Sequence, residues 1–178
     1  ASHGFFDPEQ PAADKQRPTA GQLLGLANPS FLSEDPLLRS GIVLTGANHP
    51  DADPNDDGYL TAAEITGMDL RQTELVTLSA CDTGLGSVRS GEGVYGLQRA
   101  LTVAGSRSTL LSLWKVDDEA TATFMAEFYR RLMAGEGRAD ALRNTQAAFR
   151  NHSNEEYRDL YVWGAFQLTG DWRPLPAR

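Results

Sequence analysis

The sequence predicts an α/β fold, with a mostly parallel central sheet flanked by helices. Two features indicate this fold class: short apolar runs rich in β-branched residues, and helical periods of roughly 10 to 17 residues that separate them. Apolar runs of this length are typical of strands that helices bury on both faces. Strands that alternate with helices in this way favour a parallel sheet.

Four apolar runs are predicted to be strands. Gly41 and Gly46 bound the first run, and the second leads into the stretch SACDTG at 79–84. In order along the chain, the strands are expected at residues 42–45, 75–78, 109–114 and 165–168.

Three amphipathic helices are predicted between these strands, because apolar residues recur there three and four positions apart. Gly105 and Gly135 follow the first and second helix, where glycine commonly ends a helix. Asp117 or Asp118 is predicted to cap the start of the second helix. The helices are expected at residues 95–104, 120–133 and 141–149.

The length of 178 residues fits a single domain over 1–178. Residues 7–36 carry five prolines and no sustained period, which predicts a long surface excursion, and residues 48–58 form an acidic loop. The chain begins with Ala1 rather than Met, so we expect a piece of the protein to precede it.

The charge balance limits the partners. With 16 basic and 24 acidic residues, the formal net charge is −8, and no basic run is present, so nucleic acid is not an expected partner. The longest apolar stretches fall far below the roughly 18–20 residues that span a membrane. No signal peptide is recognisable either. We therefore expect a cytoplasmic protein without a membrane partner.

Cys81 is the single cysteine, so an intrachain disulfide and a cysteine-clustered zinc site are excluded. A lone thiol is either a small buried hydrophobic group or a nucleophile that needs a histidine beside it. Cys81 follows a predicted strand and precedes a glycine-rich turn, and active sites of parallel sheets gather beyond the carboxyl ends of strands. His3 stands where an upstream strand would have ended. The residues alone leave both readings of Cys81 open.

Eight stretches make the sequence recognisable, among them SHGFF at 2–6, LSACDTGLG at 78–86 and SLWKVDD at 112–118. With these motifs the chain resembles the CHAT domain, a caspase-like module often joined to tetratricopeptide repeats and related to caspases, separase, gingipains and clostripain. The remaining matching stretches are 36–41, 46–48, 57–64, 91–97 and 163–166.

The resemblance implies a three-layer caspase-like fold whose first strand or two lie upstream of this chain. It also implies a cysteine peptidase with a dyad of His3 and Cys81. The Cys81 thiolate would attack the scissile carbonyl, and His3 would act as general base or as proton donor to the leaving amine. The backbone N–H groups of Gly4 and Cys81 would bind the oxyanion.

The resemblance to separase, which carries a Trp-x-Val-x-Asp stretch, implies substrate-binding residues as well. Asp118, together with Asp82, would select a basic residue before the cut, whereas the competing reading makes Asp117 and Asp118 helix caps. Trp114 would contact the substrate backbone or pack only against the core. We expect substrate to add as an extended strand near residues 112–114.

Residues 53–64 fit the calcium-binding loop of an EF-hand, with oxygen ligands at loop positions 1, 3, 5 and 9 and Glu64 at position 12. No amphipathic helix precedes this loop, however, and Thr61 with Glu64 also fits a capping box that opens a helix over 62–66. The family resemblance favours the cap, so we expect no metal and no cofactor. His49 and His152 are predicted to be solvated surface histidines.

These observations predict a cysteine endopeptidase that cleaves protein or peptide substrates. A helical-repeat (TPR-like) region or another regulatory partner in a larger bacterial protein would gate the site. The alternative is a catalytically silent CHAT module that acts as a protein-interaction scaffold. A third reading, a calcium-binding structural domain, depends on residues 53–64 alone.

Overall fold

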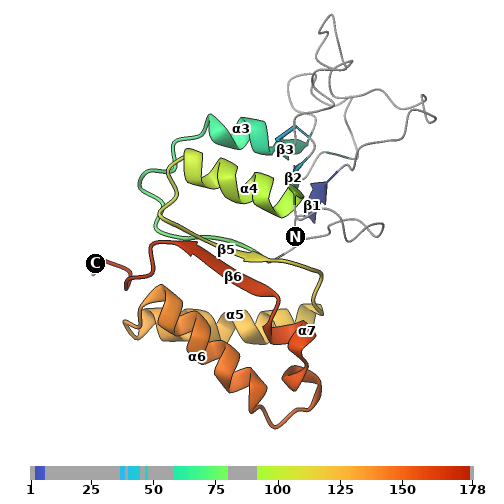
Figure 1. Cartoon of the computed structure of the whole chain (residues 1–178), viewed down its shortest axis with the longest axis vertical. Coiled ribbons are helices and arrows are strands. Elements are labelled where there is room, and N and C mark those ends of the chain that lie inside the picture. The colour runs from blue at the N-terminus through green and yellow to red at the C-terminus, as the bar shows by residue number, and fades with distance from the viewer. Residues whose placement is uncertain are drawn as a thin grey trace, which may run out of the picture. The chain divides into compact units, whose positions relative to one another are not determined.

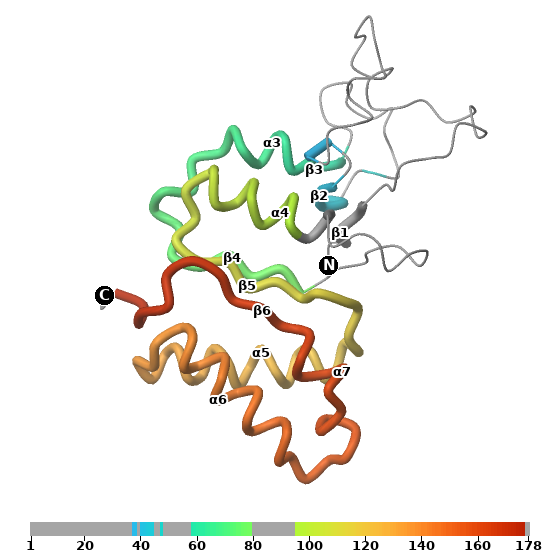
Figure 2. Tube along the Cα trace, viewed as in Figure 1, coloured from blue at the N-terminus to red at the C-terminus, as the bar shows by residue number. Residues whose placement is uncertain are grey.

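The structure is a computed structural model that describes residues 3–6, 37–38, 40–44, 47, 58–79 and 92–176. Of residues 3–6 and 92–94 it describes the backbone only. The chain divides into two compact units, one of residues 1–69 with 82–104, the other of residues 70–81 with 105–178. Figure 1 labels most of the helices and strands of both units, and Figure 2 also labels β4.

The first unit contains a three-stranded antiparallel sheet in the order β1-β2-β3. Two helices, α3 and α4, pack against each other, and α4 also contacts β2. The bounds of these elements are β1 His3–Phe6, β2 Ser40–Val43, β3 Tyr59–Thr61, α3 Ala62–Thr66 and α4 Glu92–Val103.

The second unit contains a mixed sheet in the order β4-β5-β6, whose three strands run side by side in Figure 2. The central strand β5 is buried along its whole length. β5 is parallel to β4 and antiparallel to β6. The bounds are β4 Val76–Leu78, β5 Ser108–Ser112, α5 Asp118–Met133, α6 Arg138–Arg150, η1 Glu156–Arg158, α7 Leu160–Trp163 and β6 Phe166–Gly170.

The expectation of a mostly parallel sheet is therefore not confirmed. Among the described strands only β4 and β5 pair in parallel. Two long helices, α5 and α6, separate β5 from β6, and the second helix returns the chain toward the end of the sheet where β5 finished. β6 therefore starts beside the end of β5 and runs antiparallel to it. The fold class itself, mixed α/β, is confirmed.

The four predicted strands all form, at slightly shifted bounds, but two further strands were not predicted. His3–Phe6 is itself strand β1, whereas His3 had been placed after the end of an upstream strand. Tyr59–Thr61, strand β3, is only three residues long. Both are too short to show a period of two in the sequence, and it is pairing with β2 that makes them strands.

The three predicted helices are confirmed as α4, α5 and α6, together with their end signals. Gly105 and Gly135 have φ values of 100° and 89°, in the left-handed region where glycine is favoured. Asp117 is the N-cap of α5, and its Oδ1 accepts hydrogen bonds from the N–H groups of Glu119 at 3.0 Å and Ala120 at 3.1 Å. Asp118 is the first residue of the helix and is exposed.

The two neighbouring aspartates allow a matched test of this cap. Asp117→Ala is expected to lower the free energy of unfolding by about 1 kcal/mol, because two N–H groups of the first turn lose their acceptor. Asp118→Ala removes an interaction with the helix dipole alone and is expected to cost less than about 0.5 kcal/mol. Urea unfolding of both variants measures the difference, and equal losses would contradict the assignment of the cap to Asp117.

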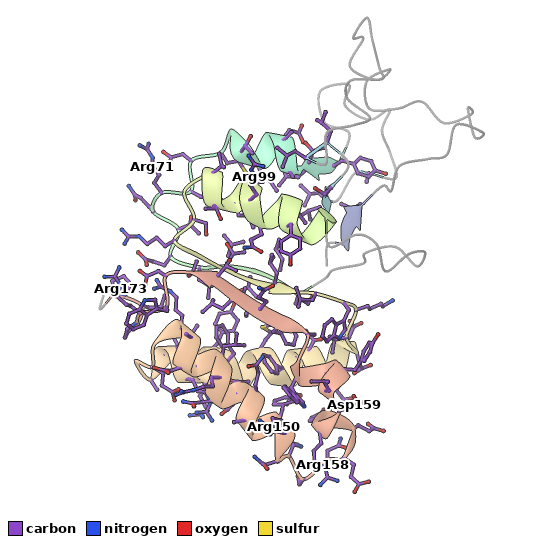
Figure 3. The ribbon with its side chains drawn as sticks, viewed as in Figure 1. Arg71, Arg99, Arg150, Arg158, Asp159 and Arg173 are labelled. Carbon is purple, nitrogen blue, oxygen red and sulfur yellow. The ribbon has the colours of Figure 1, made fainter. Side chains whose placement is uncertain are left out.

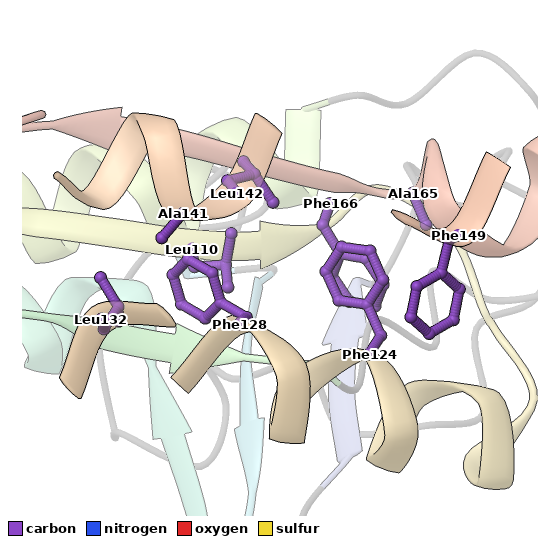
Figure 4. Close-up of a cluster of buried hydrophobic side chains, with 9 residues drawn as sticks. All are labelled: Leu110, Phe124, Phe128, Leu132, Ala141, Leu142, Phe149, Ala165 and Phe166. Carbon is purple, nitrogen blue, oxygen red and sulfur yellow. The ribbon is translucent and has the colours of Figure 1, made fainter. Parts of the chain in front are cut away.

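Nine buried residues from β5, β6, α5, α6 and the segment before β6 form the core of the second unit (Figure 4). The ring of Phe124 stacks on Phe166 with centroids 4.3 Å apart and meets the edge of Phe149 at 5.0 Å. These contacts fix α5 and α6 on one face of the sheet. The nine residues are Leu110, Phe124, Phe128, Leu132, Ala141, Leu142, Phe149, Ala165 and Phe166.

A buried arginine connects the segment before β4 with the segment after β6. Arg138, at the start of α6, is 1% exposed and contacts the Glu74 carboxylate at 2.5 Å and the Asp171 carboxylate at 3.6 Å. Its Nη1 also donates to the backbone oxygen of Arg173 at 3.0 Å. Glu74, which precedes β4, is held in addition by Arg107 at 3.1 Å. The entry to β4 and the exit from β6 are thus anchored on one side chain.

Hydrogen bonds from the side chain and backbone of Arg173, labelled in Figure 3, lower the pKa of Asp171. A carboxyl group whose pKa is lowered by folding stabilises the fold at pH values above its unfolded pKa of about 4. This contribution is lost as the pH falls below that value.

Among the helices that the structure describes, none has the length and apolar character that a membrane span needs.

Candidate functional site

The predicted general base lies on β1. The backbone of His3 starts this strand and pairs with Val43 of β2, and Gly4, a predicted oxyanion donor, lies opposite Ile42. The predicted nucleophile Cys81 and its neighbour Asp82 lie outside the described residues. The pairing of His3 with Cys81 therefore stays a prediction.

The segment that leads to Cys81 is described up to residue 79. β4 ends at Leu78, three positions before Cys81, and Leu78 lies opposite Leu111 in the parallel pair with β5. The carboxyl ends of β4 and β5 consequently lie at the same edge of the sheet, which is the edge where α/β sheets carry their sites. Trp114 and Asp118 follow β5 at this edge.

Trp114 packs against the protein's own chain. Its half-buried ring lies 5.4 Å from the ring of Tyr161 in α7, and its Nε1 donates to the backbone oxygen of Tyr161 at 2.7 Å. The indole also packs against the edge of the buried core cluster. Trp114 thus packs against the core cluster and Tyr161, and contact with substrate stays a prediction.

Part of the expected substrate edge at residues 112–114 is already occupied. Ser112 lies opposite Phe166, and the N–H of Leu113 donates to the backbone oxygen of Ala165 at 2.8 Å. The side of β5 that faces β6 is therefore closed as far as Leu113. An added peptide strand therefore has to pair with residues 112–114 on the side of β5 that faces β4. On that side the pairing with β4 ends at Leu78, which lies opposite Leu111.

The structure assigns the helix cap to one residue of the aspartate pair. The carboxylate of Asp117 caps α5 by accepting hydrogen bonds from the N–H groups of its first turn. The carboxylate of Asp118 is exposed and makes no hydrogen bond or ion pair with the residues that the structure describes. Of the two, Asp117 thus has a structural role in the cap, and a contact of Asp118 with substrate stays a prediction.

Glu64 takes part in a capping box, as the family resemblance favoured. Its Oε2 accepts hydrogen bonds from the N–H and the hydroxyl of Thr61, each at 2.8 Å, while the Thr61 hydroxyl oxygen accepts the N–H of Glu64 at 3.2 Å. The calcium reading needs this carboxylate as a ligand. Residues 53–57 of the loop lie outside the described residues, and no group of three His, Cys, Asp or Glu suited to a metal occurs among those described.

His152 is not the solvated histidine that the sequence suggested. Its ring is half-buried, 5.7 Å from the ring of Phe149 and 4.9 Å from that of Tyr157, and its Nδ1 accepts the N–H of Asn154 at 3.0 Å. The polar sequence around His152 gave no sign of these ring contacts, because Tyr157 reaches it only once the chain has turned. His49 lies outside the described residues.

Sequence reasoning also missed α7, which adjoins Trp114 at the sheet edge. Asp159, labelled in Figure 3, caps this helix through a 2.8 Å hydrogen bond from the N–H of Tyr161 to its Oδ1. Leu160 and Tyr161 are 60% and 67% exposed. The signal that could have found the helix is an aspartate directly before the apolar run LYVW at 160–163.

Comparison with known proteins covers nearly the whole chain. A family model described as CHAT domain matches residues 1–171. Tetratricopeptide repeat protein 28 of Homo sapiens is 30% identical over 125 residues, 70% of this chain and 5% of the relative. The Mus musculus protein of the same name is 32% identical over 127 residues, 67% of this chain. The chain thus spans about 5% of the length of these curated relatives. From this match, this chain belongs to the CHAT domain family.

Proposed function

We propose that this chain is a cysteine endopeptidase domain that uses Cys81 and His3 to cleave protein substrates. The observation that carries the proposal is the family match over residues 1–171, which includes both residues in a caspase-like, peptidase-related family. The parallel pair β4–β5 supports it, because β4 ends at Leu78, three positions before Cys81 in the sequence, and the sites of such sheets gather beyond the carboxyl ends of strands. The proposed arrangement is one three-layer domain over residues 1–178.

The proposed chemistry follows from the two side chains. The Cys81 thiolate attacks the scissile carbonyl carbon, and the backbone N–H groups of Gly4 and Cys81 bind the oxyanion. The C–N bond then breaks, and His3 gives a proton to the leaving amine. Water, deprotonated by His3, hydrolyses the thioester and releases the acid product and the Cys81 thiolate.

We propose that Asp118, with Asp82, selects a basic residue before the cut. The exposed carboxylate of Asp118, which makes no hydrogen bond or ion pair with the described part of the chain, supports this assignment, since the helix cap uses Asp117. Trp114 would position the substrate beside them.

The proposed setting is a larger bacterial cytoplasmic protein whose helical-repeat region controls access to the site. Support for the repeat region comes from the two relatives, both named tetratricopeptide repeat proteins. The small share of their length that this chain spans leaves ample room for such a region.

The test is a peptide-library cleavage assay on the full-length protein, with Cys81→Ala as the matched control. Wild type is expected to cut after Arg or Lys, and the Cys81→Ala variant is expected not to cut. Asp118→Asn is expected to lower kcat/KM for these substrates by about tenfold or more, because the basic side chain of the substrate loses a charge-assisted hydrogen bond. The melting temperature of each variant is measured alongside.

Cleavage that persists in Cys81→Ala would refute the proposed nucleophile. No cleavage by wild type, together with alkylation of Cys81 by iodoacetamide no faster than that of free cysteine, would favour the interaction-scaffold alternative.

A further inference from the structure

A four-residue helix that exposes two large apolar side chains stands at the sheet edge that carries the proposed site. Leu160 and Tyr161 of α7 are 60% and 67% exposed. We propose that these two residues, with the ring of Trp114, form a subsite for an aliphatic or aromatic side chain of the peptide substrate. This inference rests on the proposed peptidase function and extends it to specificity. We call these three residues the α7 platform.

Several hydrogen bonds tether the α7 platform, although α7 is too short to be stable by itself. Hydrogen bonds fix both ends of the helix, and the guanidinium of Arg150 lies 5.5 Å from the centroid of the Trp163 ring. The tethers are Trp114 Nε1 to Tyr161 O at 2.7 Å, Tyr161 N to Asp159 Oδ1 at 2.8 Å, Trp163 Nε1 to Arg158 O at 3.1 Å and Gln146 Nε2 to Trp163 O at 3.2 Å.

This combination of tethering and exposure points to a ligand. In α7, Leu160 and Tyr161 are exposed to water. The contact of apolar surface with water is unfavourable in free energy, and a bound apolar group would remove that contact. Pre-ordered aromatic side chains lose little entropy on binding, which is why Tyr and Trp dominate the centres of binding surfaces.

The position of the α7 platform identifies the occupant as substrate. Trp114 follows the carboxyl end of β5, and the neighbouring parallel strand β4 ends at the same edge with Leu78, three positions before Cys81 in the sequence. α7 also contacts α5, whose first residue is Asp118, a carboxylate with no hydrogen bond or ion pair to the described residues. An exposed carboxylate and an apolar surface together complement a peptide that carries a basic residue near an apolar one.

The test measures specificity with the full-length protein. Peptides keep the basic residue before the cut and carry Leu, Phe or Ser at each neighbouring position in turn. Wild type is expected to prefer Leu or Phe over Ser at one position by about tenfold in kcat/KM. In the variant Leu160→Ala/Tyr161→Ala, this preference is expected to fall below about twofold, because kcat/KM falls more for the Leu and Phe peptides than for the Ser peptide.

Met133→Ala is the matched control, because Met133 is also an apolar side chain, 81% exposed, at the last residue of α5. This substitution is expected to leave the preference intact. The proposal is overturned if wild type shows no apolar preference, if the double variant keeps it, or if the double variant loses activity toward all peptides equally. That last result would mean a structural role or a contact with the repeat region.

A second readout separates this proposal from the peptidase proposal. Fluorescence anisotropy measures binding of the same peptides to Cys81→Ala protein, with and without the α7 substitutions. If wild type cleaves nothing but the apolar peptides bind more tightly and lose this advantage in the α7 variant, the α7 platform stands and the peptidase proposal fails. Equal binding of the apolar and Ser peptides would overturn the α7 platform whatever the outcome for cleavage.

Discussion

Replacing Cys81 by alanine is expected to lower kcat/KM by about 10³-fold or more, and His3→Ala is expected to lower it by a similar factor. In His3→Ala, the Cys81 thiol has no base beside it and is mostly protonated at neutral pH. In Cys81→Ala, no nucleophile is left to attack the scissile carbonyl. Because the two groups act as one unit, the variant that lacks both is expected to be no slower than either single variant. The measurement is kcat/KM of the two single variants and the double variant, with the peptide from the library that wild type cleaves best.

The pH dependence of thiol alkylation provides an independent check on the dyad. A protonated His3 beside Cys81 favours the thiolate, so His3→Ala is expected to shift alkylation of Cys81 to higher pH. His152→Ala is the matched control, since His152 packs on aromatic rings at the end of α6 and is not expected to alter this profile. Additive losses in the double variant, or an unshifted alkylation profile in His3→Ala, would contradict a dyad.

The second large effect concerns the buried arginine of the second unit. Glu74→Gln is expected to lower the free energy of unfolding by about 3 kcal/mol, because it leaves the guanidinium of Arg138, 1% exposed, without its nearest carboxylate. Replacing both partners, as Glu74→Gln/Arg138→Met, is expected to cost less than the two single changes added together, since no buried charge then remains unpaired. Urea unfolding curves of the three variants measure these energies.

An exposed ion pair serves as the control for this experiment. Glu155 and Arg158 contact each other at 2.6 Å, but their side chains are 87% and 43% exposed. Glu155→Gln is expected to cost less than about 0.5 kcal/mol, because water screens such pairs. If Glu74→Gln cost no more than Glu155→Gln, the anchoring role of Arg138 would be refuted.

The sequence by itself determined the features whose signals are local. The helix α5 was predicted from its apolar period, with a cap at Asp117 or Asp118 and a glycine stop at Gly135, because caps act within one turn of the helix. The capping box of Thr61 and Glu64 was readable for the same reason. The motifs around His3, Cys81 and Trp114 were sufficient to recognise the family, which the match over residues 1–171 confirms.

Only the tertiary structure decided which strands pair and in which direction. β6 runs antiparallel to β5 because a pair of helices, rather than one, returns the chain to the sheet, and no single residue encodes that geometry. The burial of Arg138 depends on Glu74, 64 residues away, and the α7 platform depends on the contact of Tyr161 with Trp114, 47 residues away. A charged or exposed side chain of this kind has no local signature, because its environment comes from segments that meet only after folding.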